Sequence, residues 1–283
     1  MFPYFFKLPA FGPFSEPQPI HSYGILIAVG FVLATQMIAR EAKRLGEPRP
    51  DKLTDLAFYL LLVGLVGSRV LYIIVNIEEY AAHPYEILYF WRGGLVFYGG
   101  FFAAVGYAVW WCRRNGKPFF LIADILIPMV AFNHVWGRIG CVAAGCCFGA
   151  ITHSPVGIEY PIQSVVQQMQ HAQGFIRAFD RPLPVHAVQL YEAAGELALF
   201  MLLMWLRDRK RYHGQLLLVW LALYPILRSF CEALRGDKER GFVVPGLIST
   251  SQFVSALTAL AAIALFFYLK RAGDRQERAA AQP

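Results

Sequence analysis

Charged residues are scarce in this sequence. Asp, Glu, Lys and Arg make up 16% of its 283 residues and hydrophobic residues 57%, whereas an ordinary soluble domain is about a quarter charged. This composition excludes an ordinary soluble domain. Several apolar runs approach the roughly 20 residues that a helix needs to cross a bilayer. We therefore expect an all-α, polytopic membrane protein with a single integral-membrane domain over residues 1–283.

The sequence lacks a concentrated basic region and a recognisable signal peptide. Its net charge of +7 comes from short basic clusters between apolar runs. This pattern is typical of membrane topology, so we expect no nucleic-acid partner. The start, MFPYFFKLPAFGPF, lacks a basic segment followed by an apolar segment and a small-residue cleavage site, so no cleaved signal peptide is expected. Its aromatic residues and prolines favour a segment lying at the membrane interface.

Seven apolar runs are predicted to span the membrane, at about residues 22–40, 56–77, 95–112, 119–136, 188–206, 215–234 and 245–269. A long insertion that is less apolar, residues 141–187, is predicted to form a small periplasmic cap. Lys and Arg gather in alternate loops, at residues 40–52, 113–117, 207–211 and 270–278. Loops rich in Lys and Arg face the cytoplasm. We therefore expect a periplasmic amino terminus and a cytoplasmic carboxyl terminus.

Three arginines fall inside the predicted spans or at their ends: Arg69, Arg138 and Arg228. An arginine at membrane depth costs about 3 kcal/mol on insertion scales, so each indicates a functional site with a partner. Arg138 lies between Gly137 and Gly140, which leave room for a helix or a ligand head group.

The helical spacing around Arg228 suggests a shared polar face. Tyr224, Arg228 and Glu232 follow at intervals of four residues. Because one carboxylate cannot neutralise three arginines, we expect a cationic cavity that binds an anion, and arginine forks suit phosphate oxygens. The alternative is a set of separate structural ion pairs with Glu192, Glu196, Asp124 or Glu232.

Glycines mark two further positions. Gly64, Gly67 and Ser68 predict a close helix contact beside Arg69. The pairs at residues 93–94 and 99–100 predict an irregular turn that lines a cavity, into which Tyr98 would present its hydroxyl. The alternative is an ordinary interfacial tyrosine.

The five cysteines show no obvious disulfide framework. Cys112 and Cys231 lie in or near predicted helices and are expected to be inert. Cys141, Cys146 and Cys147 form a C-x4-CC pattern, which is not a recognised zinc pattern, and vicinal cysteines rarely ligate one ion. We therefore expect no metal and no cofactor. A disulfide in an oxidising compartment and plain packing both stay open.

Several motifs together resemble one family. GRIGCVAAGCCFG at residues 137–149 is similar to the GR-x-GN-x3-GE-x2-G signature of the prolipoprotein diacylglyceryl transferases. Five other segments resemble motifs of the same family in the same order: HSYG at 21–24, GSRVLY at 67–72, WRGGLVFYGG at 91–100, PVHAVQLYEA at 184–193 and YPILRSFCE at 224–232.

The resemblance implies a reaction in the bacterial inner membrane. The diacylglyceryl group of phosphatidylglycerol would move to the lipobox cysteine of a preprolipoprotein signal peptide, with thioether formation and release of glycerol phosphate. The partners would be these two substrates and the membrane lipids. By the resemblance, the predicted catalytic residues are Arg138, Arg228 and Tyr98, and the predicted substrate-binding residues are Tyr23, Arg69, Tyr72, Gly99, Gly137, Gly140, Tyr224 and Glu232.

The chain departs from the family pattern at several positions. Tyr98 stands where the best-studied form has a histidine, Cys141 and Cys146 replace the signature asparagine and glutamate, and Ala187 replaces a proline. A divergent paralogue with a different acceptor is therefore one alternative. The others are an anion or phospholipid transporter that uses the intramembrane arginines, and a redox or metal protein that uses the cysteines.

Overall fold

The computed structural model describes residues 4–8, 18–82, 84–88, 93–236, 242–244 and 248–280. Most of these residues are helical, and the strands among them form three short antiparallel pairs. The prediction of an all-α protein is confirmed. Six helices are long and apolar enough to cross a membrane, as expected for a polytopic membrane protein.

Each of the seven predicted spans corresponds to a helix: α1 (Ser22–Arg44), α2 (Asp51–Val75), α4 (Phe97–Arg114), α5 (Phe119–Ala144), α7 (Val188–Arg207), α8 (Gln215–Ala233) and α9 (Thr250–Ala280). Helix α4 is not among the six apolar ones, because its 18 residues end in Arg113 and Arg114. Helix α5 continues past its predicted end near residue 136, since Gly145 is the first residue beyond it with a left-handed backbone, at a φ of +71°. Arg138 and Cys141 therefore lie within this helix.

The shorter elements are α3 (Ile77–Ala82), η1 (Pro84–Leu88), α6 (Val165–Ala172) and the strands β1 (Tyr4–Leu8), β2 (Gln18–His21), β3 (Gly157–Ile158), β4 (Val185–His186), β5 (Phe242–Val244) and β6 (Ile248–Ser249). Part of the predicted interfacial segment forms β1, paired with β2, while residues 1–3 and 9–17 lie outside the described residues. The predicted cap contains α6 and the β3–β4 pair.

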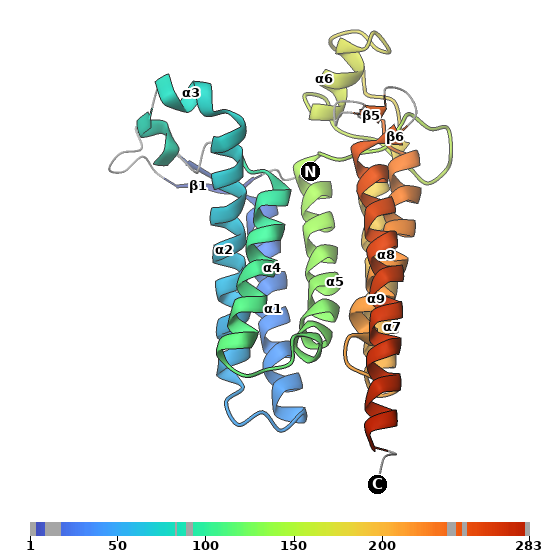
Figure 1. Ribbon diagram of the computed structural model, residues 1–283. Helices are drawn as coiled ribbons and strands as arrows, with labels where there is room; N and C mark the ends of the chain where they lie inside the picture. The colour runs from blue at the N-terminus through green and yellow to red at the C-terminus, as the bar shows by residue number, and fades with distance from the viewer. Residues whose placement is uncertain are drawn as a thin grey trace. The chain divides into compact units, whose positions relative to one another are not determined.

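The chain divides into two compact units, Met1–Ala34 with Ile127–Pro283, and Thr35–Leu126. The expected single domain stays a prediction. In the second unit α2 packs along α4 (Figure 1). Their backbones touch: a Cβ atom on Gly67 would meet the carbonyl of Gly99, and one on Gly100 would meet the carbonyl of Gly64. This confirms the close helix contact predicted beside Arg69.

In the first unit α8 packs against both α7 and α9 (Figure 1). Ala131 of α5, Leu203 of α7 and Leu216 of α8 form a fully buried apolar cluster, which joins the three helices. A separate cluster of Phe148, Tyr160, Val166 and Val185 forms the core of the cap.

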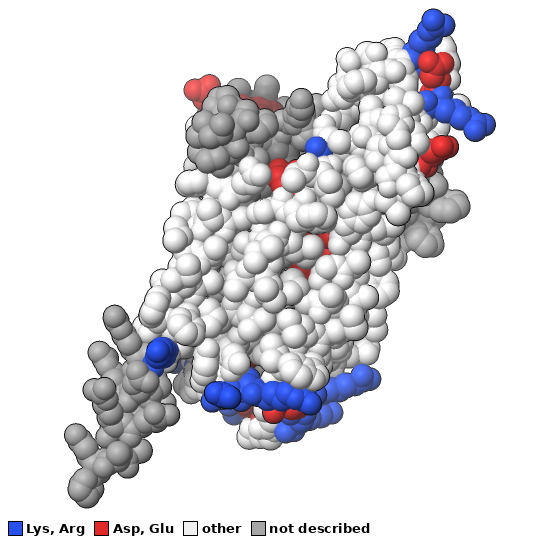
Figure 2. Space-filling view, turned by 90° about the vertical axis from the view of Figure 1, so that its right-hand side faces the viewer, with Lys and Arg blue, Asp and Glu red and all other residues white. Residues whose placement is uncertain are grey.

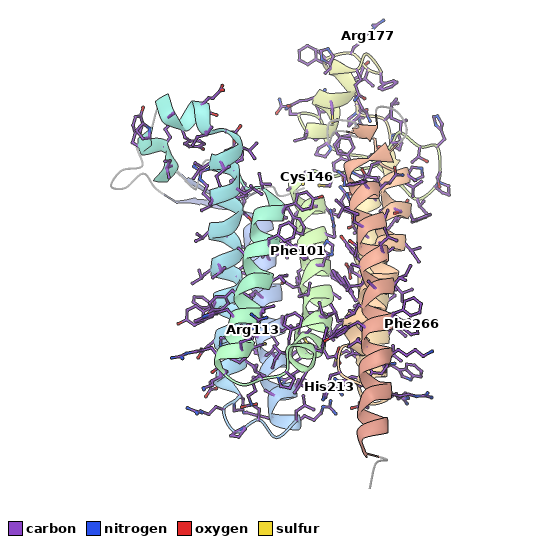
Figure 3. The ribbon with its side chains drawn as sticks, in the orientation of Figure 1. Phe101, Arg113, Cys146, Arg177, His213 and Phe266 are labelled. Carbon is purple, nitrogen blue, oxygen red and sulfur yellow. The ribbon has the colours of Figure 1, made fainter. Side chains whose placement is uncertain are left out.

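The surface agrees with a membrane location. Figure 2 shows a face that is almost free of charged residues between its two ends, where Lys and Arg side chains gather. Large apolar side chains of the first unit are exposed, and Phe266 of α9 is one of them. Figure 3 shows Phe266 projecting away from the helix. Such a surface suits contact with lipid chains.

Candidate functional site

Three helices of the first unit each contribute polar side chains spaced four residues apart. They are His134 and Arg138 on α5, Glu192 and Glu196 on α7, and Trp220, Tyr224, Arg228 and Glu232 on α8. Residues four apart lie on one helical face. The three faces meet, because the side chains are linked by the hydrogen bonds and ring contacts described below.

Glu192 connects two of the predicted arginines. Its Oε1 accepts a 2.7 Å hydrogen bond from Arg138 Nη2, and its Oε2 accepts one of 3.2 Å from Arg228 Nη1. Arg228 Nη2 also donates to Glu232 Oε2 at 2.8 Å. The Glu192 side chain is 0% exposed, so its charge is compensated by these guanidinium groups and not by water. Arg138 and Arg228 therefore share one site, as predicted.

A second set of contacts holds Arg138 from the other side. Arg138 Nε donates to His134 Nε2 at 3.3 Å, and His134 Nδ1 lies 2.7 Å from Glu196 Oε1. Because Nε2 accepts from Arg138, the proton belongs on Nδ1, which then donates to Glu196. Arg138 is thus oriented by both His134 and Glu192.

Aromatic rings close the site on α8. Tyr224 stacks on Trp220 with ring centroids 4.8 Å apart and planes inclined by 3°, and it lies 5.6 Å from the His134 ring. Trp220 Nε1 donates to Glu196 Oε2 at 3.4 Å. The predicted residue Tyr224 therefore packs directly against the groups that position Arg138.

The sequence predicted a cavity with an excess of positive charge, and for this cluster that prediction is wrong. Its two arginines are matched by Glu192 and Glu232, and Glu196 adds a third carboxylate beside His134. The sequence argument considered Glu232 alone as the shared partner. A fully buried guanidinium needs a local counter-charge, and α7 supplies it. With His134 neutral, three carboxylates face two guanidinium groups, so the chain itself supplies enough negative charge to neutralise both arginines.

Tyr23, Gly137 and Gly140 belong to the same unit. A Cβ atom on Gly140 would meet the ring and the Cα of Tyr23, so the absence of a side chain allows α1 and α5 to touch. A Cβ atom on Gly137 would meet no atom of the described residues within 4 Å. One glycine beside Arg138 thus serves helix packing, and the other leaves open space.

The remaining predicted residues lie in the second unit. Arg69 donates to backbone carbonyls of residues 86, 87, 93 and 94 at 2.7–3.5 Å, and its guanidinium lies 5.7 Å from the Tyr72 ring centroid and 5.4 Å from that of Tyr80. Gly93 and Gly94 have φ values of +89° and +78°, which confirms the irregular turn. Arg69 therefore holds this turn in place.

Two further predicted site residues, Tyr98 and Gly99, lie in the first turn of α4. Gly99 touches the Gly67 backbone, so its role in the structure is helix packing. Tyr98 is half-buried and packs edge-on against Phe97, and its hydroxyl makes no hydrogen bond within the described part of the chain. The roles predicted for Tyr98, Gly99, Arg69 and Tyr72 in substrate binding or catalysis stay predictions.

Sequence reasoning left Glu192, Glu196, His134 and Trp220 out of the site. The sequence signal that could have found them is the four-residue spacing of polar residues inside apolar helices. It is as clear for α5 and α7 as for α8. Glu192 and Glu196 were considered only as partners of structural ion pairs. The structure shows that such pairing and a common arginine site are compatible.

Comparison with known proteins identifies the family. The sequence profile of the prolipoprotein diacylglyceryl transferases matches residues 11–268, nearly the whole chain. The chain belongs to this family. The resemblance to the diacylglyceryl transferases found in the sequence is thus confirmed.

Three similar members of the transferase family span most of the chain. Phosphatidylglycerol–prolipoprotein diacylglyceryl transferase 2 of Clostridium perfringens is 31% identical over 259 residues, which cover 91% of this chain and 94% of that protein. The transferase of Vibrio cholerae is 30% identical and covers 94% of this chain and 93% of its own length. That of Legionella pneumophila is 31% identical, with 89% and 93% covered.

Proposed function

We propose that this membrane protein transfers the diacylglyceryl group of phosphatidylglycerol to the lipobox cysteine of a preprolipoprotein signal peptide. Family membership supports the reaction. The observation in the structure that supports it best is the convergence of Arg138 and Arg228 on one buried carboxylate within helices of membrane-spanning length.

Arg138 can bind the phosphodiester without losing its present contacts. Its Nε and Nη2 donate to His134 and Glu192, while Nη1 makes no hydrogen bond within the described part of the chain. The Arg138 side chain is 13% exposed, so part of it can be reached by a ligand. A phosphate oxygen is a strong acceptor for such a guanidinium donor.

The two arginines can stabilise the charge that develops on the phosphate as the leaving group departs. The cysteine sulfur attacks the glyceryl carbon that carries the phosphate oxygen, and a C–S bond forms as the C–O bond breaks. The electron pair of the broken bond stays on the phosphate of glycerol phosphate, and the thiol proton is released. Guanidinium donors that are already fixed by Glu192 and His134 stabilise this developing charge without reorganising.

The acceptor thiol must lose its proton to attack. Two sources of activation are open: the Tyr98 hydroxyl as base, or the local arginine field, meaning the charge of the Arg138 guanidinium acting on a thiol directly beside it. An unperturbed tyrosine has a pKa near 10, so we favour the arginine field. The variant Tyr98→Phe separates the two, because it keeps the ring and removes only the hydroxyl. An unchanged transfer rate would exclude Tyr98 as the base.

The location follows from the same proposal. The protein would lie in the bacterial inner membrane with its amino terminus and cap in the periplasm and its carboxyl terminus in the cytoplasm, because Lys and Arg gather in alternate loops. Its partners would be phosphatidylglycerol, the signal peptide and surrounding lipids, with no nucleic acid. Accessibility of single cysteines introduced into the cap and the carboxyl terminus tests this orientation.

The decisive assay uses purified protein in vesicles with labelled phosphatidylglycerol and a lipobox peptide. We expect label on the peptide and release of glycerol phosphate, and no label when serine replaces the peptide cysteine. Arg228→Lys should nearly abolish transfer, whereas Arg113→Lys, at the exposed end of α4, should not. Lipid movement between leaflets without peptide labelling would instead support a transporter and overturn the proposal.

A further inference from the structure

The carboxyl end of α5 brings two cysteines together. Gly145 donates its backbone N–H to the Val142 carbonyl and Cys146 donates to the Cys141 carbonyl, both at 3.1 Å. With Gly145 at a φ of +71°, this is the hydrogen-bond pattern of a Schellman motif. In that motif the residues at the positions of Cys141 and Cys146 are frequently in side-chain contact.

A strained residue adds the third thiol. Cys147 has a φ of +62°, a left-handed conformation that non-glycine residues rarely adopt and that costs about 1–3 kcal/mol. The sulfur atoms of Cys141, Cys146 and Cys147 all lie within 4.8 Å of one another, and none of these three cysteines forms a disulfide. Figure 3 shows Cys146 where α5 gives way to the cap. Vicinal cysteines rarely ligate one ion, which was the objection from the sequence, but these neighbouring thiols lie together at the left-handed backbone of Cys147.

The loop that carries these thiols is fixed from α7. Gln189 is 1% exposed, and its Nε2 donates to the Cys146 carbonyl at 2.7 Å and to the Tyr160 hydroxyl at 2.9 Å. Arg235 lies near Cys147, which places a positive charge beside the group. A polar second layer of this kind orients ligands and balances the charge of thiolates.

The spacing of the three sulfur atoms fits a single metal ion. Three sulfur atoms placed 2.3 Å from a common metal lie about 4 Å apart, so closing the observed separation of 4.8 Å or less needs only small side-chain rotations. Thiolates select soft ions such as monovalent copper and zinc. Protein zinc sites of the structural type have four ligands, and among the described residues no histidine or carboxylate joins this group. Three sulfurs alone favour the monovalent ion.

We propose that Cys141, Cys146 and Cys147 form a three-coordinate binding site for monovalent copper at the carboxyl end of α5. The site does not depend on lipid transfer, but it begins one helical turn beyond Arg138 on the same helix. An ion bound there would hold the end of α5 in a fixed position.

The test is a titration of the reduced, full-length protein with Cu(I), in competition with a chromogenic Cu(I) chelator and without oxygen. We expect one tightly bound ion per chain and X-ray absorption that shows sulfur ligands only. Cys147→Gly should weaken binding by at least about 100-fold. Because glycine accepts the left-handed backbone, this variant should still fold, as circular dichroism will check. Cys112→Ser, which removes a buried thiol of α4, should bind as the wild type does.

Other results would overturn the proposal. They are the absence of stoichiometric binding, binding that survives Cys147→Gly, nitrogen or oxygen ligands around the copper, or an equal preference for Zn²⁺ in a parallel titration. Each measurement is independent of transferase activity. Loss of copper binding with normal lipid transfer would therefore leave the proposed function intact.

Discussion

The carboxylate of Glu192 is the group on which the arrangement of both arginines depends. Its two oxygens accept hydrogen bonds from Arg138 and Arg228 at 2.7 and 3.2 Å, and its side chain is 0% exposed. Glu192→Gln keeps the shape and one acceptor oxygen but removes the charge. Two buried arginines then lose their common counter-charge, so we expect both lower stability and misplaced guanidinium groups.

The magnitude can be worked from these contacts. Removing one member of a buried ion pair costs about 3–5 kcal/mol, and the glutamine oxygen keeps one hydrogen bond, so about 3 kcal/mol is expected. For a chain of this size that corresponds to a fall in Tm of roughly 6–12 °C. A displacement of about 1 Å at the reacting groups costs on the order of 100-fold in rate. Transfer by Glu192→Gln should fall at least that far.

The assay pairs thermal unfolding with peptide lipidation for three variants. Glu159→Gln, on the exposed surface of the cap, should match the wild type in both measurements. Glu196→Gln should have a smaller effect on transfer than Glu192→Gln, because the hydrogen bonds of Glu196 go to His134 and Trp220 and not to an arginine. Wild-type transfer and Tm in Glu192→Gln would refute the reasoning.

Three further predictions concern the second unit. Gly99→Ala should lower stability by about 1–3 kcal/mol, because its Cβ would meet the α2 backbone, whereas a Cβ on Gly106 of the same helix would meet no atom of the described residues within 4 Å, so Gly106→Ala should not lower the Tm. Arg69→Lys loses the fork that reaches several carbonyls, so limited proteolysis should cut the turn before α4 faster than in the wild type; equal rates would contradict this role. The hydrogen bond from Lys117 lowers the pKa of Glu47, so this pair stabilises the fold fully above the ordinary glutamate pKa, and the contribution is lost as pH falls from there through the lowered pKa. At pH 7 the pair contributes under about 1 kcal/mol to the free energy of unfolding, so Glu47→Gln should have a slightly lower Tm than the wild type. This Tm difference should shrink at pH 4, and a difference that grows would contradict the assignment.

Much of the fold could be predicted because lipid imposes simple rules on sequence. Long apolar runs located the seven helices, and the small residues at Gly64 and Gly67 predicted the contact of α2 with α4. The boundaries were harder. The α5 helix runs on to Ala144 because Gly137 and Gly140 keep helical backbones, and the left-handed Gly145 ends it.

The site was predicted in part. Charged residues in apolar helices are conspicuous, so Arg138, Arg228 and Glu232 could be found from sequence alone. Their partner Glu192 could not be assigned, because which helices face one another depends on tertiary packing. The convergence of the three thiols was also hidden, since it depends on the left-handed backbone of Cys147. Sequence spacing carries no sign of that conformation.

The most direct test of the account is the lipidation rate of Arg138→Lys at saturating phosphatidylglycerol. Lysine keeps the positive charge but lacks the planar fork by which Arg138 contacts His134 and Glu192 through two nitrogens and keeps a third for a phosphate oxygen. We predict a fall in kcat of about 100-fold or more, in protein that inserts and unfolds like the wild type. A kcat within twofold of the wild type would contradict the claim that this guanidinium stabilises the departing phosphate.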